Sequence, residues 1–522
     1  MPTPPPTTPI PMPTGAPPGR RTLPRTALGL LLALALARFL LHALLAGRYG
    51  FDRDELAFLS DARHLAWGYV AYPPVTSFLA HVSMQWFGDS LTAFRLPSAL
   101  AQALATLLAG LMARELGGGR PAQAIAAIAV CCAPFSMVSG TMLSYSGLDY
   151  LWWVLAAWML LKIANARDDG SDSRRWWLGL GLAIGLGMMT RYTMLVGAIG
   201  IVAGVLATPL RRHLATPWPW AGAALSLLVF APNAWWQWQH GFVYLDFVQY
   251  IHARDIRMGQ TAAFLPAQLS VGANPLTLPL WVAGLAWLAL AKDAARGRAL
   301  AWFYGTALLL YWLVDAREYY LAPAYPMLLA AGAVCLEHGL ARLPRRAAIL
   351  CRGATALVLA AAFLTTSLFA LPLAAIGSPL WNATASVHPQ FSDRIGWPEL
   401  VAQVAGVYHA LPEAERKRTA IYANNYGEAG AFERYGPRYG VPPAISQANS
   451  FWARGYGDPP PTTVIVVGSD AAHIRETRAT CVLAGRIRIP HGVDNDEARR
   501  PDIYVCRDLR FEWSRAWPRK FG

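Results

Sequence analysis

The sequence predicts a polytopic α-helical membrane protein that ends in a smaller α/β domain outside the membrane. Of the 522 residues, 55% are hydrophobic and only 15% are charged, whereas about a quarter of the residues of a soluble protein are charged. The apolar residues form continuous runs of roughly twenty, the length of a helix that crosses a bilayer. Continuous runs also argue against a closed barrel, whose strands alternate. After about residue 377 strand-like segments replace these runs.

The N-terminal segment, residues 1–26, is predicted to be a disordered cytoplasmic tail. It begins MPTPPPTTPIPMPTGAPPG, a Pro- and Thr-rich composition that cannot form a packed core. Arg20, Arg21 and Arg25 then precede an apolar run from Ala27 to Ala46. The run is too long for a signal peptide and lacks a clear cleavage site of small residues, which favours a retained signal-anchor helix.

The membrane domain, residues 27–376, is predicted to contain about eleven transmembrane helices. The expected spans are 27–47, 95–113, 121–140, 148–164, 176–190, 193–210, 219–236, 275–291, 299–314, 321–340 and 349–371. If the N-terminus is cytoplasmic, every loop on that side is basic, which is the pattern of the positive-inside rule. The basic residues in these loops are Arg114 and Arg120; Lys162, Arg167, Arg174 and Arg175; Arg211 and Arg212; Lys292, Arg296 and Arg298; and Arg342, Arg345, Arg346 and Arg352.

The same clusters explain the formal charge of +14. No basic patch with interleaved exposed aromatics is found, so nucleic acid is not expected as a partner. Residues 48–94, 237–274 and 315–320 then face outward, as does everything after about residue 377.

The outward domain, residues 377–522, has the pattern of an α/β fold. TAIYANN (419–425) and TTVIVVG (462–468) are typical of buried strands, and a helix-compatible segment follows each. Neither strand leads into a G-x-G-x-x-G or P-loop motif, so nucleotide binding is not expected. Cys481 and Cys506 fall on two further predicted strands, and they could form a disulfide in an oxidising compartment. Whether the two sulfurs meet stays open at this stage.

The first outward loop concentrates ionisable residues directly after the first span, in FDRDELAFLSDARHLAWGYVAYPP (51–74). Asp54 and Glu55 have two interpretations. They can favour the N-terminus of a solvated helix, or they can place a carboxylate over a cavity at membrane level as a general base. The position after a span, and the AYPP turn into the apolar segment VTSFLAHVSMQWFG, favour the second.

Further charged residues lie at the same outer boundary. Asp149, in SYSGLDYLWW, is either part of the site or an interfacial residue in an aromatic belt. Arg191, in LGLGMMTRYTMLVG, is a lone cation at a depth where a cation needs a partner. That partner is either a lipid-linked phosphate or a structural ion pair. Arg254, Arg257 and Arg317 add outward cations near this level.

The order of these motifs resembles the bacterial polytopic glycosyltransferases of the GT-C class. The acidic pair and the Pro-Pro turn are followed by WFGDSLTAFRLPSAL, LGLGMMTRYTML, APNAWWQWQHGF and EYYLAPAYPMLL. The nearest group is the protein-mannosyltransferase-like family that includes the lipopolysaccharide-core and lipid A sugar transferases (glycosyltransferase family 83). The resemblance covers about residues 27–372.

The resemblance implies inverting transfer of a sugar from a polyprenyl-phosphate-linked donor, without a cofactor. The acceptor would be extracytoplasmic: lipopolysaccharide or lipid A, another glycolipid, or a protein. The enzyme would lie in the bacterial inner membrane, in contact with membrane lipid, with its site facing the periplasm. Asp54 would be the base and Glu55 a supporting acid. Asp149 matches an acidic position near the site of the family, and Arg317 stands where many members have Lys. Together with Arg191, Arg254 and Arg257, which are singled out by their position alone, they are the candidates for substrate binding.

One departure from the family concerns the loop at Ala71, Tyr72 and Pro73. The aminoarabinose transferases of lipid A carry Glu-Lys-Pro there. The missing Lys argues against aminoarabinose as the sugar and puts phosphate contact by this loop in doubt. The missing Glu removes a suggested metal ligand, so no tightly bound metal is expected.

Two other functions remain open from the sequence. A multispan transporter or flippase of a lipid-linked sugar fits the number of spans, although transporters place ionisable residues near the bilayer midplane. An O-antigen polymerase or ligase would share the donor chemistry, although its active loop usually comes late in the chain.

The charge pattern gives a first prediction about topology. A fusion of alkaline phosphatase after residue 522 should be active, because the basic loops place this end outside the cytoplasm. Enzyme activity of the fusion in whole cells measures this. An inactive phosphatase together with an active cytoplasmic reporter at the same point would overturn the topology.

Overall fold

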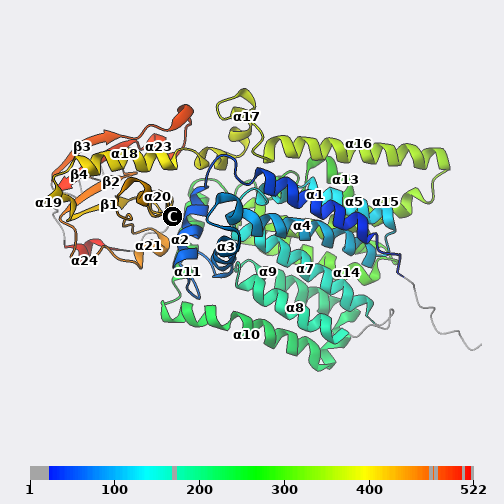
Figure 1. Cartoon of the computed structure of the whole chain (residues 1–522). Coiled ribbons are helices and arrows are strands. Elements are labelled where there is room, and N and C mark those ends of the chain that lie inside the picture. Colours follow the sequence, from blue (N-terminus) through cyan, green and yellow to red (C-terminus); the bar gives the residue numbers. More distant parts are fainter. Residues whose placement is uncertain (1–22, 167–172, 470–473, 475–479, 508–511, 519–522) are drawn as a thin grey trace, which may run out of the picture.

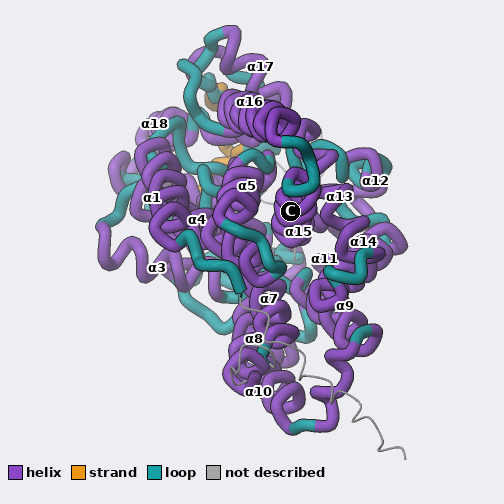
Figure 2. Tube along the Cα trace, turned by 90° about the vertical axis from the view of Figure 1, so that its right-hand side faces the viewer, coloured by secondary structure: helices purple, strands orange, loops and turns teal. Residues whose placement is uncertain are grey.

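A computed structural model of the chain describes residues 23–166, 173–469, 474, 480–507 and 512–518. It consists of a large helical bundle with a small α/β domain at one end (Figure 1). Seen from the opposite end, the long helices of the bundle run side by side (Figure 2). Most of the predicted tail 1–26, namely residues 1–22, lies outside the described residues.

Every predicted apolar span is helical in the structure. The corresponding helices are α1 (Leu28–Leu45), α4 (Leu91–Glu115), α5 (Arg120–Cys131), α6 (Pro134–Ser139), α7 (Tyr145–Asn165), α8 (Ser173–Met188), α9 (Met194–Ala207), α10 (Pro217–Gln239), α13 (Leu278–Leu290), α14 (Arg298–Leu313), η4 (Glu318–Ala324), α15 (Tyr325–Leu340) and α16 (Arg345–Ala370). The predicted span 121–140 is divided between α5 and α6, and Pro134 opens α6. A proline at a first helical position is well tolerated because that N–H has no intrahelical partner.

Length and composition alone identify fewer spans than eleven. Within the described residues, five helical segments are long and apolar enough to cross a membrane: α1, α4, α7, α16 and the segment Glu318–Leu340. Two further pairs qualify only as bent spans, each with a 98° bend: Met194–Ala207 with Pro209–Ala215, and Pro275–Leu290 with Ala295–Leu313. A helical membrane protein is therefore confirmed, and the number of spans stays a prediction.

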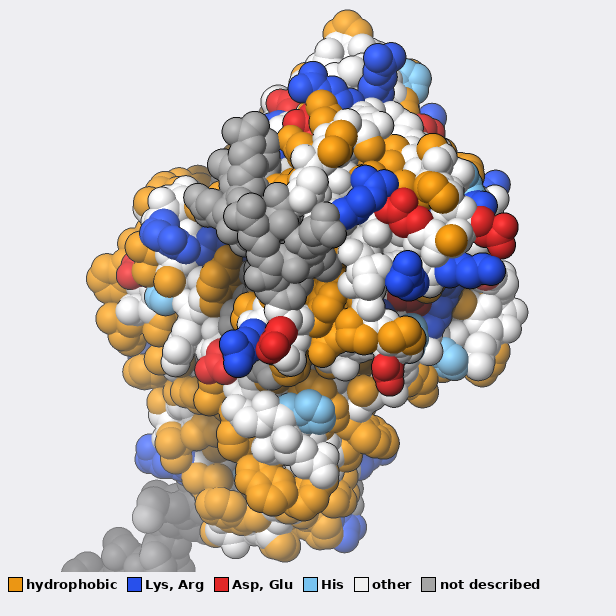
Figure 3. All heavy atoms as spheres, turned by 90° about the vertical axis from the view of Figure 1, so that its left-hand side faces the viewer, with side chains coloured by type: hydrophobic (Ala, Val, Ile, Leu, Met, Phe, Trp, Pro, Cys, Tyr) orange, Lys and Arg blue, Asp and Glu red, His pale blue; other side chains and the backbone are white. Residues whose placement is uncertain are grey.

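The outer surface of the bundle is apolar, as lipid contact requires. On α16, Leu350, Leu357 and Leu364 are 73%, 72% and 67% exposed and recur every seven residues, so they lie on one face of the helix. Viewed from the end that carries the α/β domain, charged side chains are scattered over the upper part of the molecule, and hydrophobic side chains are dense in the lower part (Figure 3).

Two short helices follow α1 at the end of the bundle, as the AYPP turn predicts. They are α2 (Arg53–Arg63) and α3 (Val75–Phe87). A capping box starts α2: the Asp52 side chain accepts from the backbone of the first turn, and the Glu55 side chain accepts from the Asp52 N–H at 2.9 Å. Such a box fixes the direction in which a helix begins.

The C-terminal domain contains a four-stranded sheet. Its strands are β1 (Thr419–Ala423), β2 (Thr463–Val467), β3 (Thr480–Arg486) and β4 (Asp502–Arg507), in the order β1-β2-β4-β3. The pair β1–β2 is parallel and the other two pairs are antiparallel. The predicted strands 419–425 and 462–468 are confirmed as β1 and β2. The main helices of the domain are α17 (Pro379–Val387), α18 (Trp397–Ala410), α20 (Tyr426–Tyr435) and α21 (Asn449–Trp452).

This domain packs directly on α2. A Cβ added at Gly430 of α20 would lie 2.6 Å from the Leu56 carbonyl oxygen, so only glycine allows this approach. One hydrophobic core combines Leu56 and Phe58 of α2 with Phe432 of α20 and Ile465 of β2. The contact is also polar: Arg454 Nη2 donates to Asp61 Oδ1 at 3.0 Å. The first outward loop and the C-terminal domain therefore form one packed unit.

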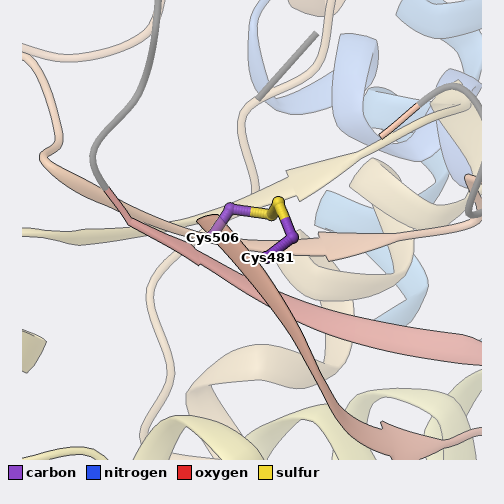
Figure 4. The surroundings of a disulfide bond; sticks show 2 residues. All are labelled: Cys481 and Cys506. Carbon is purple, nitrogen blue, oxygen red and sulfur yellow. A yellow bond between two sulfur atoms is a disulfide. The ribbon is translucent and has the colours of Figure 1, made fainter. Parts of the chain in front are cut away.

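Cys481 and Cys506 face each other across β3 and β4 and are joined by a disulfide in the structure (Figure 4). Their S–S distance is 2.09 Å and 25 residues separate them. Because β4 also pairs with β2, the link ties the outer strand β3 to the strand that joins it to the rest of the sheet.

The disulfide gives a second prediction. Cys506→Ser should lower the free energy of unfolding by roughly 2–4 kcal/mol, since a cross-link of this loop length restricts the unfolded chain by about that much. Thermal unfolding of the purified protein measures the loss, and Cys351→Ser, an exposed free thiol, is the matched control. Thiol labelling of unreduced, denatured protein that modifies both Cys481 and Cys506 would contradict the link.

Candidate active site

Two cavities meet at Asp54, between α2, the outer ends of the bundle helices and the C-terminal domain. The first, which we name the Arg191 cavity, has a volume of about 610 Å³, and the second, the Phe135 cavity, about 1070 Å³. Asp54, Tyr145 and Arg317 line both. A carboxylate at such a junction can contact two molecules that enter from different sides.

Local structure and a contact from the C-terminal domain fix Asp54. Its backbone N–H donates to Asp52 Oδ1 at 2.9 Å, and its Oδ1 accepts from the Tyr426 hydroxyl at 2.7 Å. Burial and the Asp54 carboxylate raise the pKa of Tyr426, so the phenol keeps its proton and donates. No hydrogen-bond donor among the described residues contacts Asp54 Oδ2, so this oxygen is free for a substrate.

Asp52 is buried rather than exposed in a loop, and this affects the charge at the site. Burial, followed by the nearby Asp54 charge, raises the pKa of Asp52 to about 8. A carboxyl group with this pKa is mostly protonated at neutral pH. Asp52 therefore adds little negative charge to the site at neutral pH.

Glu55 lines neither cavity, so its position does not favour a direct catalytic role. It is fully buried in a bidentate pair with Arg95, with Nε–Oε1 at 2.8 Å and Nη2–Oε2 at 2.6 Å. Glu55 Oε1 also accepts from the Leu143 N–H at 2.7 Å, and Arg95 donates to the carbonyl oxygens of Ala46 and Gly50. Glu55 is thus a positioning residue that joins α2, α4 and the end of α1.

Arg191 is a buried cation without a direct ion pair among the described residues. Its side chain is only 7% exposed and lines the Arg191 cavity. The guanidinium lies over the rings of Tyr145, Tyr319 and Tyr320 at 5.1, 5.5 and 4.4 Å. Within the part of the chain that the structure describes, no carboxylate lies within ion-pair distance of it. Cation–π contacts compensate only part of the cost of burying a charge, so the site favours an anionic ligand.

Asp149 lies behind Arg191 and lines neither cavity. It is 1% exposed, and its Oδ2 accepts from Thr193 Oγ1 at 2.8 Å. Thr193 itself lines the Arg191 cavity. Asp149 therefore contributes to the field around Arg191 and does not contact a ligand directly.

The remaining predicted cations divide into three cases. Arg254 lines the Arg191 cavity, with Nη2 at 3.3 Å from Asp255 Oδ1. Arg317 lines both cavities and pairs with Asp255 through contacts of 2.5 and 2.8 Å, so Arg254 and Arg317 share one carboxylate. Arg257 lines neither cavity, and its Nε donates to the Ala253 carbonyl oxygen at 3.4 Å, so a substrate contact is not supported for Arg257.

The Arg191 cavity continues into an apolar groove between α9 and α14, which pack against each other. Val196 and Ile199 come from α9, and Leu310 and Val314 from the end of α14. Ile199 is 45% exposed and Val314 57% exposed on the outer surface of the bundle. A lipid chain can therefore enter this groove from the membrane while its polar end reaches Arg191.

The loop at Ala71, Tyr72 and Pro73 lines the Arg191 cavity without adding a cation. The Tyr72 hydroxyl donates to Asp61 Oδ2 instead of facing a ligand. Among the described residues, no group of three or more His, Cys, Asp or Glu side chains is placed to hold a metal ion.

Sequence reasoning missed two residues of the site, Arg95 and Tyr426, and misjudged the role of Glu55. The capping pattern Asp52-x-x-Glu55 could have shown that the Glu55 side chain is turned toward the start of its own helix. Arg95 and Tyr426 gave no such signal, because Arg95 meets Glu55 across 40 residues and Tyr426 meets Asp54 across 372.

Part of the chain is similar to known glycosyltransferases. Residues 71–236 match the family model of dolichyl-phosphate-mannose-protein mannosyltransferases. The undecaprenyl phosphate-α-4-amino-4-deoxy-L-arabinose arabinosyl transferase of Pseudomonas aeruginosa is 37% identical over 109 residues, 20% of this chain and 19% of that protein. A second such transferase, from Pseudomonas fluorescens, is 31% identical over 182 residues, 33% of this chain and 31% of that protein. The matches thus span a fifth to a third of these relatives.

Solved structures share the fold over nearly the whole chain. ArnT from Cupriavidus metallidurans bound to undecaprenyl phosphate superposes with a TM-score of 0.57 at 16% identity, covering 92% of this chain and 98% of that one. The oligosaccharyltransferase AglB of Archaeoglobus fulgidus, in complex with an inhibitory peptide and a dolichol phosphate, superposes with a TM-score of 0.51 at 13% identity. This superposition covers 86% of this chain and 70% of that one. The GT-C fold predicted from the sequence is confirmed.

Proposed function

We propose that this chain is an inverting glycosyltransferase that moves a sugar from a polyprenyl-phosphate-linked donor to an extracytoplasmic acceptor. The observation that carries the proposal is the position of Asp54, at the junction of two cavities of which one is lined by a buried cation without a direct ion pair among the described residues. The family match at residues 71–236 and the undecaprenyl phosphate in the ArnT structure support the same donor class.

The Arg191 cavity suits the donor. Its apolar groove between α9 and α14 takes the polyprenyl chain, and Arg191 provides the counter-charge for the phosphate. Arg254 adds a second cation at the same cavity. Hydrogen bonds from a guanidinium to phosphate are charge-assisted and strong, and the Tyr145, Tyr319 and Tyr320 rings hold Arg191 in place.

Asp54 acts as the general base. Its free Oδ2 takes the proton of the acceptor hydroxyl while the acceptor oxygen attacks the anomeric carbon of the sugar. The bond between that carbon and the phosphate oxygen breaks, and the electron pair leaves with the polyprenyl phosphate. Arg191 stabilises the charge that develops there. Attack opposite to the leaving phosphate inverts the anomeric centre.

We place the enzyme in the bacterial inner membrane with its site and C-terminal domain toward the periplasm. The basic loops are on the opposite side of the predicted topology. A transporter or flippase of a lipid-linked sugar is disfavoured because Asp54 and Arg191 line a cavity that Tyr426 of the C-terminal domain also lines, whereas transporters place their substrate sites near the bilayer midplane.

The first test removes the base. Asp54→Asn should lower the rate of transfer by roughly 10²–10⁴, the usual contribution of general-base catalysis. The measurement is transfer from purified polyprenyl-phosphate sugar in vitro, with Asp246→Asn as the control, since Asp246 is an exposed acid on α11 (Val243–Arg257) outside both cavities. Near-normal turnover of Asp54→Asn would remove the main support for the proposal. A selective loss in well-folded Glu55→Gln would move the base to Glu55.

The second test concerns the donor. Arg191→Ala should weaken binding of undecaprenyl phosphate about ten- to a hundredfold, because a charged hydrogen bond contributes roughly 1.5–3 kcal/mol. Binding to the full-length protein in nanodiscs measures the effect. Arg257→Ala is the matched control and should bind normally, because Arg257 lies outside both cavities. Equal affinities of the two variants would return Arg191 to a structural role.

The third test concerns Tyr426, which contacts Asp54 from the C-terminal domain. Tyr426→Phe should lower kcat about three- to thirtyfold with little change in donor affinity, because it removes one hydrogen bond to a charged group. The acid limb of the pH–rate profile should also move to higher pH, since that hydrogen bond favours the ionised form of the base. Tyr435→Phe, on the same helix and outside both cavities, is the control. An unchanged pH profile would show that Tyr426 only supports packing.

A further inference from the structure

We infer that the Phe135 cavity receives a lipid-anchored acceptor whose reacting head group is uncharged and carries hydroxyl groups, such as a neutral glycolipid, and that it disfavours a phosphate-bearing acceptor. This inference rests on the proposed function, and it names the acceptor class of the same site.

The charge balance of the Phe135 cavity carries the inference. Apart from two tyrosines, four ionisable side chains line it: Asp54, Glu318, Arg317 and His388. Arg317 is paired with Asp255 by a bidentate contact, and Asp255 also contacts Arg254 of the other cavity at 3.3 Å. Burial and the nearby Arg394 lower the pKa of His388, so this ring is neutral at pH 7. The described lining residues of this cavity therefore include two carboxyl groups, Asp54 and Glu318, and no cation without a carboxylate partner.

Arg394 acts on the cavity through His388 but offers no contact to a ligand there. It is 1% exposed, its guanidinium lies 4.9 Å from the Phe391 ring centroid, and its Nη2 donates to Thr141 Oγ1 at 3.2 Å. It lies behind the wall and does not line the cavity. An acceptor phosphate would thus meet the Asp54 and Glu318 carboxylates without a counter-charge, which like-charge repulsion at low dielectric makes unfavourable.

The remaining wall suits a neutral polar head group. It offers uncharged hydrogen-bonding side chains from several elements: Ser139, Ser144, Gln260, Ser270 and Gln390. Next to them, the Phe135 ring stacks on Tyr319 with centroids 5.6 Å apart and an interplanar angle of 13°. Aromatic walls with a few placed polar groups are typical of small-molecule sites. Hydroxyl groups can exchange hydrogen bonds with this lining without bringing charge.

The cavity also reaches the lipid-facing helix α16, which favours a lipid over a protein acceptor. Thr365, Phe369 and Ala370 of α16 line it, and Thr365 is exposed. The same helix presents its leucines to the outside. An acceptor with acyl chains in the bilayer can therefore place its head group in the cavity without leaving the membrane.

The experiment compares two forms of one lipid. Full-length protein in nanodiscs is loaded with undecaprenyl phosphate, and binding of lipid A with both phosphates is compared with binding of the same lipid after both are removed. The dephosphorylated form should bind at least about tenfold more tightly, because it avoids the like-charge contacts. Glu318→Gln, which removes one of the two carboxylates, should reduce the difference in affinity between the phosphorylated and the dephosphorylated lipid.

A second pair of variants tests the location. Val138→Trp should fill the Phe135 cavity and reduce binding of the dephosphorylated lipid at least about tenfold while undecaprenyl phosphate binds normally. Leu357→Trp, an exposed position on α16 outside both cavities, is the control and should change neither.

The outcomes separate this inference from the proposed function. Tighter binding of the phosphorylated lipid, or competition by a Ser/Thr-containing peptide in place of the lipid, would overturn the acceptor class while donor binding stays intact. Failure of the wild-type protein to bind undecaprenyl phosphate would instead overturn the donor assignment.

Discussion

The buried pair of Glu55 and Arg95 is the interaction on which the site depends. Both side chains are fully buried, and the two contacts between them are 2.8 and 2.6 Å. Removing one partner of such a pair typically costs about 3–5 kcal/mol, because the other charge is left without compensation. Arg95 also donates to the carbonyl oxygens of Ala46 and Gly50. One guanidinium thus joins the end of α1, the start of α2 and the body of α4.

This pair fixes the direction of α2 and with it the direction of Asp54. Glu55 is turned inward by its capping box with Asp52, so the preceding residue, Asp54, faces the cavities. The two neighbouring carboxylates therefore have different tasks because their surroundings differ. Glu55 meets a permanent cation, whereas Asp54 meets a phenol and open space.

The cations show the same division between a charge with an ion pair and a charge without one. Arg317 is held by Asp255, whereas Arg191 lies over three tyrosine rings and has no described carboxylate within ion-pair distance. A cation without an ion-pair partner, Arg191, thus lines the cavity on one side of Asp54. The Phe135 cavity on the other side has no such cation among its described lining residues. This asymmetry assigns the two cavities to partners of different charge.

The sequence alone determined the class of the molecule and predicted which segments carry its candidate site. Apolar runs, basic loops and the change of character near residue 377 predict a helical membrane domain and an outer α/β domain, because burial in lipid and strand periodicity act on local composition. Asp54 and Arg191 were also identified, since an ionisable residue at a membrane boundary is costly wherever the chain folds. Only the tertiary structure separated Asp54 from Glu55, paired Arg317 with Asp255 and brought Tyr426 to Asp54. These contacts join residues up to 372 positions apart, and no local pattern specifies which distant side chain supplies the partner of a charge.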